Sequence, residues 1–123
     1  MDTPKVFESE YRFCQILWEH EPVSSRDLVK LCQEKLEWKK STTYTVIKRL
    51  SERGVVKMEN SVVTSLVSRD QVQRSESREF IDRTFNGSLP QFIAAFTSGK
   101  ALSPQEVTEI RRLIDEYERT NHE

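Results

Sequence analysis

STTYTVIKRLSERG, residues 41–54, has the periodicity of an amphipathic helix, and this helix decides the fold. Its apolar stripe comprises Thr43, Val46, Ile47 and Leu50. Gly54 ends the helix, since glycine adopts the left-handed conformation beyond a C-terminus without strain. The opposite face carries small hydroxyls, one tyrosine and basic residues, which suits the base edges and flanking phosphates of a DNA major groove. A solvated helix that only packs inward is the alternative, and this stretch alone supports both interpretations equally.

The composition limits the class of protein. The chain has 123 residues, enough for one ordinary domain or two very small ones. Only three glycines and a dominance of helix-forming residues predict a mostly helical fold. No apolar run approaches the roughly 20 residues that span a bilayer, and the N-terminus lacks the apolar core of a signal peptide. Two cysteines make no disulfide framework. We therefore expect a cytoplasmic protein without membrane insertion.

Charge is distributed unevenly along the chain. The net charge is −1, yet residues 39–57 hold six basic residues against Glu52, a local balance of +5. Residues 71–123 hold seven basic and nine acidic residues, a balance of −2. A basic patch on a neutral chain is typical of a site-directed DNA binder with an acidic partner domain.

The elements around residues 41–54 predict a winged helix. Residues 6–20 form a first helix with Phe7, Tyr11, Cys14 and Trp18 inward, and one or two extended residues follow at Val23. A second helix, capped by Ser24-Ser25, runs to about Leu36. After Gly54 the period changes to two, which predicts a hairpin of residues 55–59 and 61–65. This order of elements favours DNA binding by the third helix over a helix that only packs inward. The predicted DNA-binding residues are Lys39, Lys40, Ser41, Thr42, Tyr44, Thr45, Lys48 and Arg49.

The C-terminal part, residues 69–123, reads as three helices. They cover residues 69–85, residues 89–97, and a last helix that starts at a Ser103 cap followed by Pro104. So small a unit buries too little apolar surface alone, so we expect a second copy to cover it; a monomer folded back onto the winged helix is the alternative. The predicted domains are therefore 1–68 and 69–123. The predicted dimerisation residues are Phe80, Ile81, Phe85, Phe92, Phe96, Val107, Ile110, Leu113, Ile114 and Tyr117.

Five segments resemble the penicillinase-repressor family (the BlaI/MecI type). They are ILWEHEPVSSRDLV at 16–29, TTYTVIKRLSERGVVKME at 42–59, SLVSRDQV at 65–72, FIDRTFNGSLPQFIAAF at 80–96 and LSPQEVTEIRRLIDE at 102–116. The resemblance implies a homodimeric bacterial repressor that binds an inverted-repeat operator upstream of antibiotic-resistance genes. It also implies that a membrane sensor with a cytoplasmic protease domain triggers cleavage of the repressor. The family's scissile bond aligns with Ala95–Phe96.

Three features depart from the family pattern. The predicted wing is several residues shorter and has neither a basic nor a glycine-bearing tip. Lys39-Lys40 stand where the family usually has Ser-Pro. The chain also lacks the C-terminal cysteine cluster of the copper-responsive branch.

No enzyme or cofactor motif is present. The sequence has no phosphate loop, dinucleotide-binding glycines, nucleophile elbow or zinc-protease pair. Cys14 and Cys32 lie on inward stripes and are expected to be small buried hydrophobes rather than metal ligands, so we expect neither metal nor cofactor. Besides the DNA-binding repressor, two hypotheses stay open: a winged-helix adaptor that binds protein, and a ligand- or redox-sensing regulator acting through the cysteines.

Overall fold

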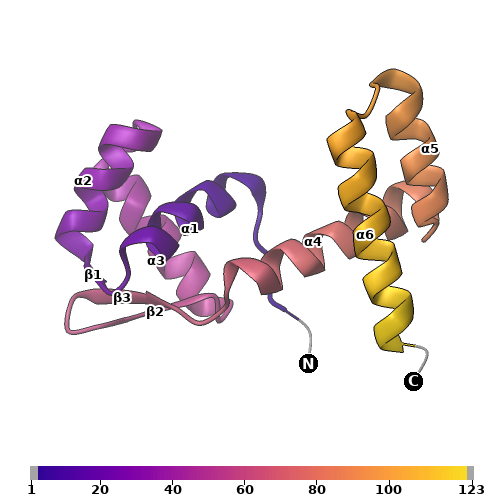
Figure 1. Ribbon diagram of the computed structural model, residues 1–123. Coiled ribbons are helices and arrows are strands. Elements are labelled where there is room, and N and C mark those ends of the chain that lie inside the picture. Colours follow the sequence, from indigo (N-terminus) through magenta and orange to yellow (C-terminus); the bar gives the residue numbers. More distant parts are fainter. Residues whose placement is uncertain (1–2, 122–123) are drawn as a thin grey trace. The chain divides into compact units, whose positions relative to one another are not determined.

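The structure, a computed structural model, describes residues 3–121. The chain forms two compact units whose boundary lies between Glu79 and Phe80, inside the fourth helix. The first unit contains α1 (Glu8–His20), β1 (Val23–Ser24), α2 (Ser25–Leu36), α3 (Lys40–Glu52), β2 (Val56–Glu59), β3 (Val62–Ser65) and the start of α4 (Arg69–Phe85). The second contains the rest of α4, α5 (Leu89–Gly99) and α6 (Pro104–Asn121) (Figure 1). The mainly helical fold with a small hairpin is as predicted, whereas the domain boundary after residue 68 stays a prediction.

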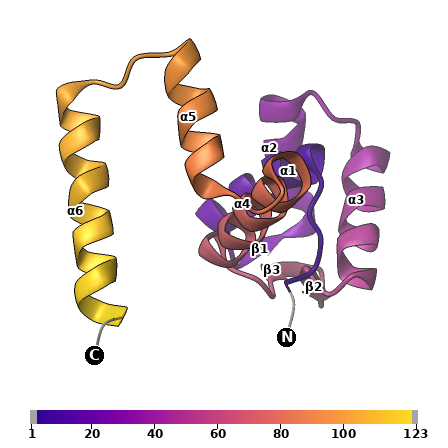
Figure 2. The same cartoon turned by 90° about the vertical axis from the view of Figure 1, so that its right-hand side faces the viewer.

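The first unit is a winged helix. Its strands form an antiparallel sheet in the order β1-β3-β2, in which Val63 lies opposite both Val23 and Met58. Asn60 and Ser61, at the hairpin tip, have φ of 52° and 63°, as a two-residue type I′ turn requires. In both views of the ribbon, α1, α2 and α3 lie on the same side of this sheet (Figures 1 and 2).

The core of the first unit confirms the predicted stripe of the third helix. Thr43, Val46, Ile47 and Leu50 are the buried residues of α3. The predicted stripe of the first helix was partly wrong. Phe7 precedes the first turn of α1 in extended conformation and is 55% exposed, so helical spacing does not apply to it. Phe13, which the stripe omitted, is fully buried and stacks on Trp38 with ring centroids 6.1 Å apart.

The helix ends follow local sequence signals. After α3, Gly54 has φ of 81°, its N–H donates to the Ser51 carbonyl, and the Val55 N–H donates to the Leu50 carbonyl. This is a Schellman motif, which satisfies carbonyls that a helix C-terminus would otherwise leave open. At α6, Ser103 and Glu106 form a reciprocal capping box. These local bonds explain why most element boundaries lie where the sequence placed them.

The second unit has almost no interior of its own. No residue of α5 or α6 is buried in the part of the chain that the structure describes. Its main internal contact is a cluster of the phenylalanine rings Phe80, Phe85, Phe92 and Phe96, with centroids 5.5–6.0 Å apart. Within residues 3–121, no helix combines the length and apolar character that crossing a membrane requires.

Candidate nucleic-acid interface

The outward face of α3 presents cations next to small hydroxyls. Lys40, Ser41, Thr42, Thr45, Lys48 and Arg49 are exposed on this helix, and Lys39 is exposed just before it. The Thr45 hydroxyl donates to the Ser41 carbonyl at 2.9 Å, which leaves its oxygen as an acceptor toward solvent. Among residues 3–121, Lys39, Lys40, Lys48 and Arg49 take part in none of the ion pairs. The structure therefore brings seven of the eight predicted DNA-binding residues together, all of them exposed.

The N-terminus of α3 adds to this positive surface. Lys39 is the N-cap, and no side chain caps the first backbone N–H groups. The first turn contains no acidic residue. A helix N-terminus with open N–H groups and flanking lysines attracts anions such as DNA phosphates. The helix begins at Lys40, one residue before Ser41, although serine is the better capping residue.

Tyr44, the eighth predicted residue, is only half exposed. Its ring packs against the core, and its hydroxyl donates to Ser25 Oγ at 3.1 Å. Ser25 is buried at the start of α2, and its N–H donates to the Ser61 carbonyl at the wing tip at 2.8 Å. Ser25 thus links α3 to the wing. Nothing in the sequence distinguished it from its neighbour Ser24, which caps α2 as predicted.

Two basic residues of the predicted +5 patch have acidic partners. Arg53 turns inward and forms an ion pair with Glu10 of α1, whose side chain is 8% exposed. The Lys57 ammonium nitrogen lies 3.7 Å from the Glu59 carboxylate oxygen Oε1 on the same strand. Exposed pairs such as the second contribute little stability but do lower the local positive potential. The basic residues of this patch that have no acidic partner among the described residues therefore lie on α3 and at the residue before it.

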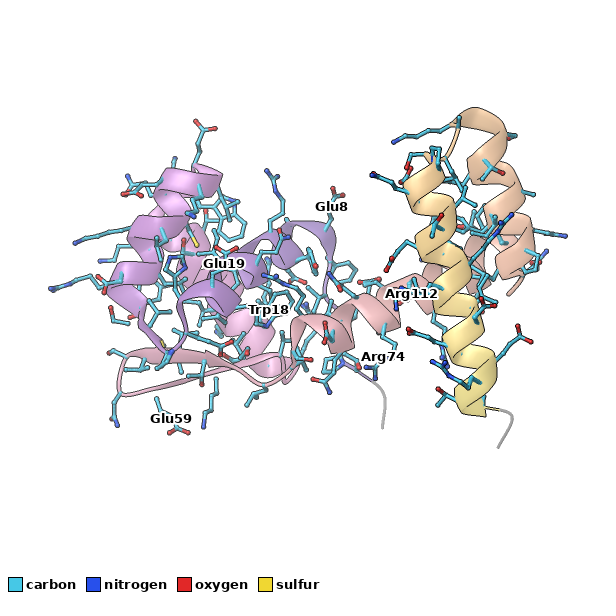
Figure 3. The ribbon with its side chains drawn as sticks, in the orientation of Figure 1. Glu8, Trp18, Glu19, Glu59, Arg74 and Arg112 are labelled. Carbon is cyan, nitrogen blue, oxygen red and sulfur yellow. The ribbon has the colours of Figure 1, made fainter. Side chains whose placement is uncertain are left out.

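A groove runs between α3 and the wing. It has a volume of about 590 Å³. Its lining comprises Tyr44, Ile47, Lys48, Ser51, Val56, Lys57, Met58, Glu59 and Leu66. Two large apolar side chains of this lining, Met58 and Leu66, are 44% and 52% exposed. Glu59 lies near the hairpin tip and points away from the helices (Figure 3), so the end of the wing is acidic rather than basic.

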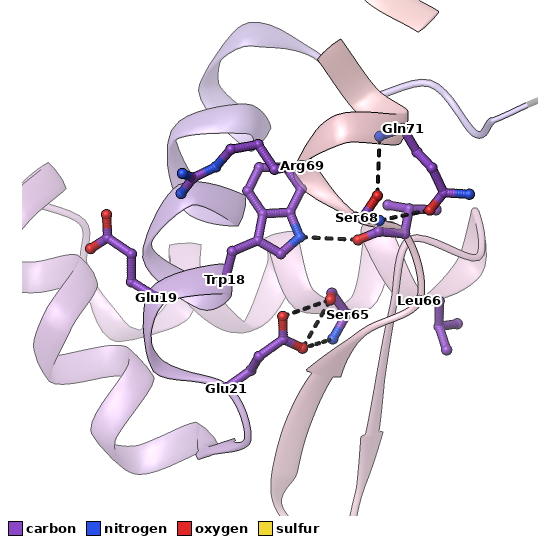
Figure 4. Close-up of a pocket in the computed structure, with 9 residues that line it drawn as sticks. Trp18, Glu19, Glu21, Ser65, Leu66, Ser68, Arg69 and Gln71 are labelled. Atoms are coloured by element: carbon purple, nitrogen blue, oxygen red, sulfur yellow. Dashed lines mark hydrogen bonds between the residues drawn. The ribbon is translucent and has the colours of Figure 1, made fainter. Parts of the chain in front are cut away.

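The wing is anchored to the end of α1 by a polar cluster, shown in Figure 4. The Glu21 carboxylate accepts hydrogen bonds from the Ser65 N–H at 2.7 Å and the Ser65 hydroxyl at 2.8–2.9 Å. Trp18 Nε1 donates to the Val67 carbonyl at 3.0 Å, and the Arg69 guanidinium lies 5.6 Å from the Trp18 ring centroid. These contacts attach the wing to the end of α1, and Trp18 packs against the core, as predicted.

The predicted dimerisation residues all lie in the second unit, and none is buried. Leu113, Ile114 and Tyr117 of α6 are 53–68% exposed, and Phe80 and Phe96 are 40% and 45% exposed. Ile81, Phe85, Phe92, Val107 and Ile110 are half-buried. The predicted scissile bond, Ala95–Phe96, lies inside α5, with both residues exposed.

The two thiols are unsuited to sensing. Cys14 and Cys32 are buried and free, and burial raises the pKa of Cys14 to about 12 and that of Cys32 to about 11. The nearby Glu10 carboxylate also raises the pKa of Cys14. Both stay protonated and therefore unreactive near neutral pH. Among the described residues, no cluster of three or more His, Cys, Asp or Glu side chains could bind a metal ion.

Comparison with known proteins gives consistent results across the chain. The sequence profile described as "Penicillinase repressor" matches residues 7–116. The penicillinase repressor of Bacillus licheniformis is 21% identical over 98% of this chain and 97% of its own length. The methicillin resistance regulatory protein MecI of Staphylococcus aureus strain Mu50 is 25% identical over 92% of this chain and 95% of its own. The match thus spans both units.

Proposed function

Because the chain belongs to the penicillinase repressor family of transcriptional repressors, we propose that it is a homodimeric bacterial repressor that binds an inverted-repeat DNA operator through α3. The observation that carries the proposal is the exposed face of α3, where Lys48 and Arg49 lie beside Thr45 without acidic partners among the described residues. Phosphate contacts set register, and short polar side chains read base edges. The protein acts in the cytoplasm, where its operator lies.

The dimer is formed by the second unit. Its last helix, α6, exposes Leu113, Ile114 and Tyr117, and an apolar surface of this kind marks a protein interface. A twofold dimer presents two α3 helices to two half-sites, which matches an inverted repeat. This proposal accounts for the absence of buried residues in α5 and α6.

Induction occurs by proteolysis in α5. A cut at Ala95–Phe96 separates α6 from the DNA-binding unit and removes its apolar face from the dimer. A membrane sensor with a protease domain is the proposed trigger. The target genes are antibiotic-resistance genes, by analogy with the names of the relatives.

A gel-shift titration tests DNA binding. The probe is the DNA upstream of the protein's own gene, with random DNA of equal length as competitor. Wild type is expected to bind the probe selectively, and a Lys48→Ala/Arg49→Ala double variant to lose binding. The matched control, Lys30→Ala/Lys35→Ala, removes the same charge from exposed residues of α2. Equal binding to both DNAs by wild type would contradict operator recognition.

The exposed Met58 and Leu66 favour one other function, a winged-helix adaptor that binds a protein partner in the groove between α3 and the wing. The same titration separates the two functions. An adaptor gives no shift with any DNA, and its Lys48→Ala/Arg49→Ala variant behaves like wild type.

A further inference from the structure

Lys5 connects the end of the recognition helix to α4. Arg53, the C-cap residue of α3, donates to the Lys5 carbonyl from Nε at 3.3 Å and from Nη2 at 3.1 Å. The Lys5 ammonium group donates to the carboxylates of Glu76 at 3.2 Å and Glu79 at 3.3 Å, both on α4. The backbone of one residue thus contacts α3, while its side chain contacts α4.

The α3 end of this connection is firmly held. Arg53 also forms an ion pair with Glu10, which accepts a hydrogen bond from the Phe7 N–H at 2.9 Å and so caps α1. Next to Lys5, Val6 is 3% exposed and belongs to the core. The Lys5 and Arg53 cations lie 5.6 Å and 5.4 Å from the Phe7 ring centroid. The segment from Lys5 to Phe7 is therefore attached to the winged helix by hydrogen bonds and by burial of Val6.

The α4 end of the connection lies beyond the helix's other anchors. Val72 is buried, and Gln73 Nε2 donates to the Tyr11 hydroxyl at 3.2 Å, so the first turn of α4 is attached to the core. Glu76 and Glu79 follow one and two turns later, roughly 5–10 Å along the helix axis. A contact at that distance from a pivot controls the angle of the helix more strongly than a contact at the pivot.

Protonation keeps the connection intact. Burial lowers the pKa of Lys5, but the hydrogen bonds and charges of Glu76 and Glu79 outweigh it and raise that pKa above its ordinary value. The ammonium group is therefore charged throughout the physiological range. The Lys5 side chain is 35% exposed, so solvent and salt weaken its ion pairs only in part.

We propose that Lys5 is a positioning residue for operator binding, because it fixes the direction in which α4 leaves the winged helix relative to α3. The proposal rests on the proposed dimeric repressor. α4 is a single helix to Phe85 and carries the chain into the second unit. A dimer reads two half-sites at once only when its recognition helices are held at matching separation and rotation. A freer α4 leaves each α3 intact but reduces the gain from linked binding.

The test compares Lys5→Met with wild type in the full chain. Methionine keeps the backbone carbonyl for Arg53 and removes only the ammonium group. The Lys5→Arg variant restores the charge, and Lys30→Met is the matched control for charge loss on an exposed site. Affinity is measured for a half-site, for the full operator, and for operators lengthened by one base pair, which rotates the half-sites by roughly 35°.

For Lys5→Met, half-site affinity is expected to stay within about twofold of wild type, while full-operator affinity falls about tenfold. The preference for the native spacing should shrink, and Lys5→Arg should recover it. Unchanged spacing preference in Lys5→Met would overturn the proposal. So would an equal loss on half-site and operator, since that is the signature of a general electrostatic or folding effect.

A second readout needs no DNA and separates this proposal from the proposed function. Amide hydrogen exchange in the free protein is expected to rise in α4 beyond residue 76 for Lys5→Met, with α3 still protected. Unchanged exchange in α4 would overturn the positioning role. Failure of the wild-type protein to bind any operator would instead refute the repressor function. The exchange measurement would still test the contact of Lys5 with Glu76 and Glu79.

Discussion

At the scale of single residues, Arg49 and Thr45 are expected to affect DNA binding differently. Arg49 lies at the edge of the α3 face and should contact phosphate, so Arg49→Ala weakens binding to all sequences and reduces the salt slope by about 0.9. Thr45→Ala should change preference at one base pair by about 1–3 kcal/mol. Titrations at several salt concentrations, on operator and random DNA, measure both. Parallel losses on the two DNAs for both variants would rule out groove reading.

The thiols provide a second prediction at this scale. Because Cys14 and Cys32 have pKa values raised to about 12 and 11, their thiolate fraction is negligible at pH 8. Native protein should therefore react with iodoacetamide far more slowly than protein unfolded in denaturant, as mass spectrometry can follow. A Cys14→Ser/Cys32→Ser variant gives the background. Rapid alkylation of the native protein that abolishes DNA binding would revive the redox-sensor hypothesis.

At the scale of one element, the start of α6 should respond to acid. The Glu106 carboxylate accepts a hydrogen bond from the Ser103 N–H at 2.9 Å, and this bond, together with the Ser103 hydroxyl, holds the pKa of Glu106 below its ordinary value. A lowered pKa in the folded state means that the cap stabilises α6 above the unfolded pKa. That stability is lost as pH falls through the folded pKa. NMR titration should place the Glu106 midpoint below that of a glutamate in an unfolded peptide, and Ser103→Ala should raise it. Because the alanine variant keeps the backbone N–H, a midpoint unaffected by this substitution would show that the Ser103 hydroxyl does not contribute to the cap.

Cleavage in α5 is a prediction about another element. Ala95–Phe96 lies within a helix, and the Phe96 carbonyl accepts from the Lys100 N–H, so a protease must open the helix locally before it cuts. A chain truncated after Ala95 should be monomeric and bind the operator roughly 100-fold more weakly, because linked binding is lost. Sedimentation and gel shift measure this. A truncated chain that stays dimeric would exclude this bond as the switch.

Element boundaries were the most predictable part of this fold. The Ser103-Pro104 start and the Gly54 stop are local signals, and the structure places helix ends beside both of them. The contacts that individual side chains make were less predictable. Arg53 counted toward the basic patch, but its partner Glu10 lies 43 residues earlier, and no local pattern reports such a contact. Likewise, the bond from Tyr44 to Ser25 depends on how two helices pack.

At the scale of the whole molecule, the association of two chains is the main prediction. Ile110→Asp/Ile114→Asp places two carboxylates in the proposed apolar interface and should cost several kcal/mol of dimer stability. The variant should sediment as a monomer and bind the operator only weakly, while the winged helix keeps its fold. Arg111→Asp/Arg119→Asp, at exposed positions of the same helix, is the control. A wild type that is already monomeric at micromolar concentration would contradict the proposal.

The scarcity of buried side chains in the second unit has a consequence for how repression responds to the concentration of the protein. If the second unit buries its apolar side chains only in a dimer, the concentration of dimer follows the square of the monomer concentration wherever monomers predominate. One cell division without new synthesis halves the chains, and it then lowers the dimer roughly fourfold. Repression of this kind fades faster than the protein is diluted, so the time to full expression after induction is set by growth as well as by proteolysis.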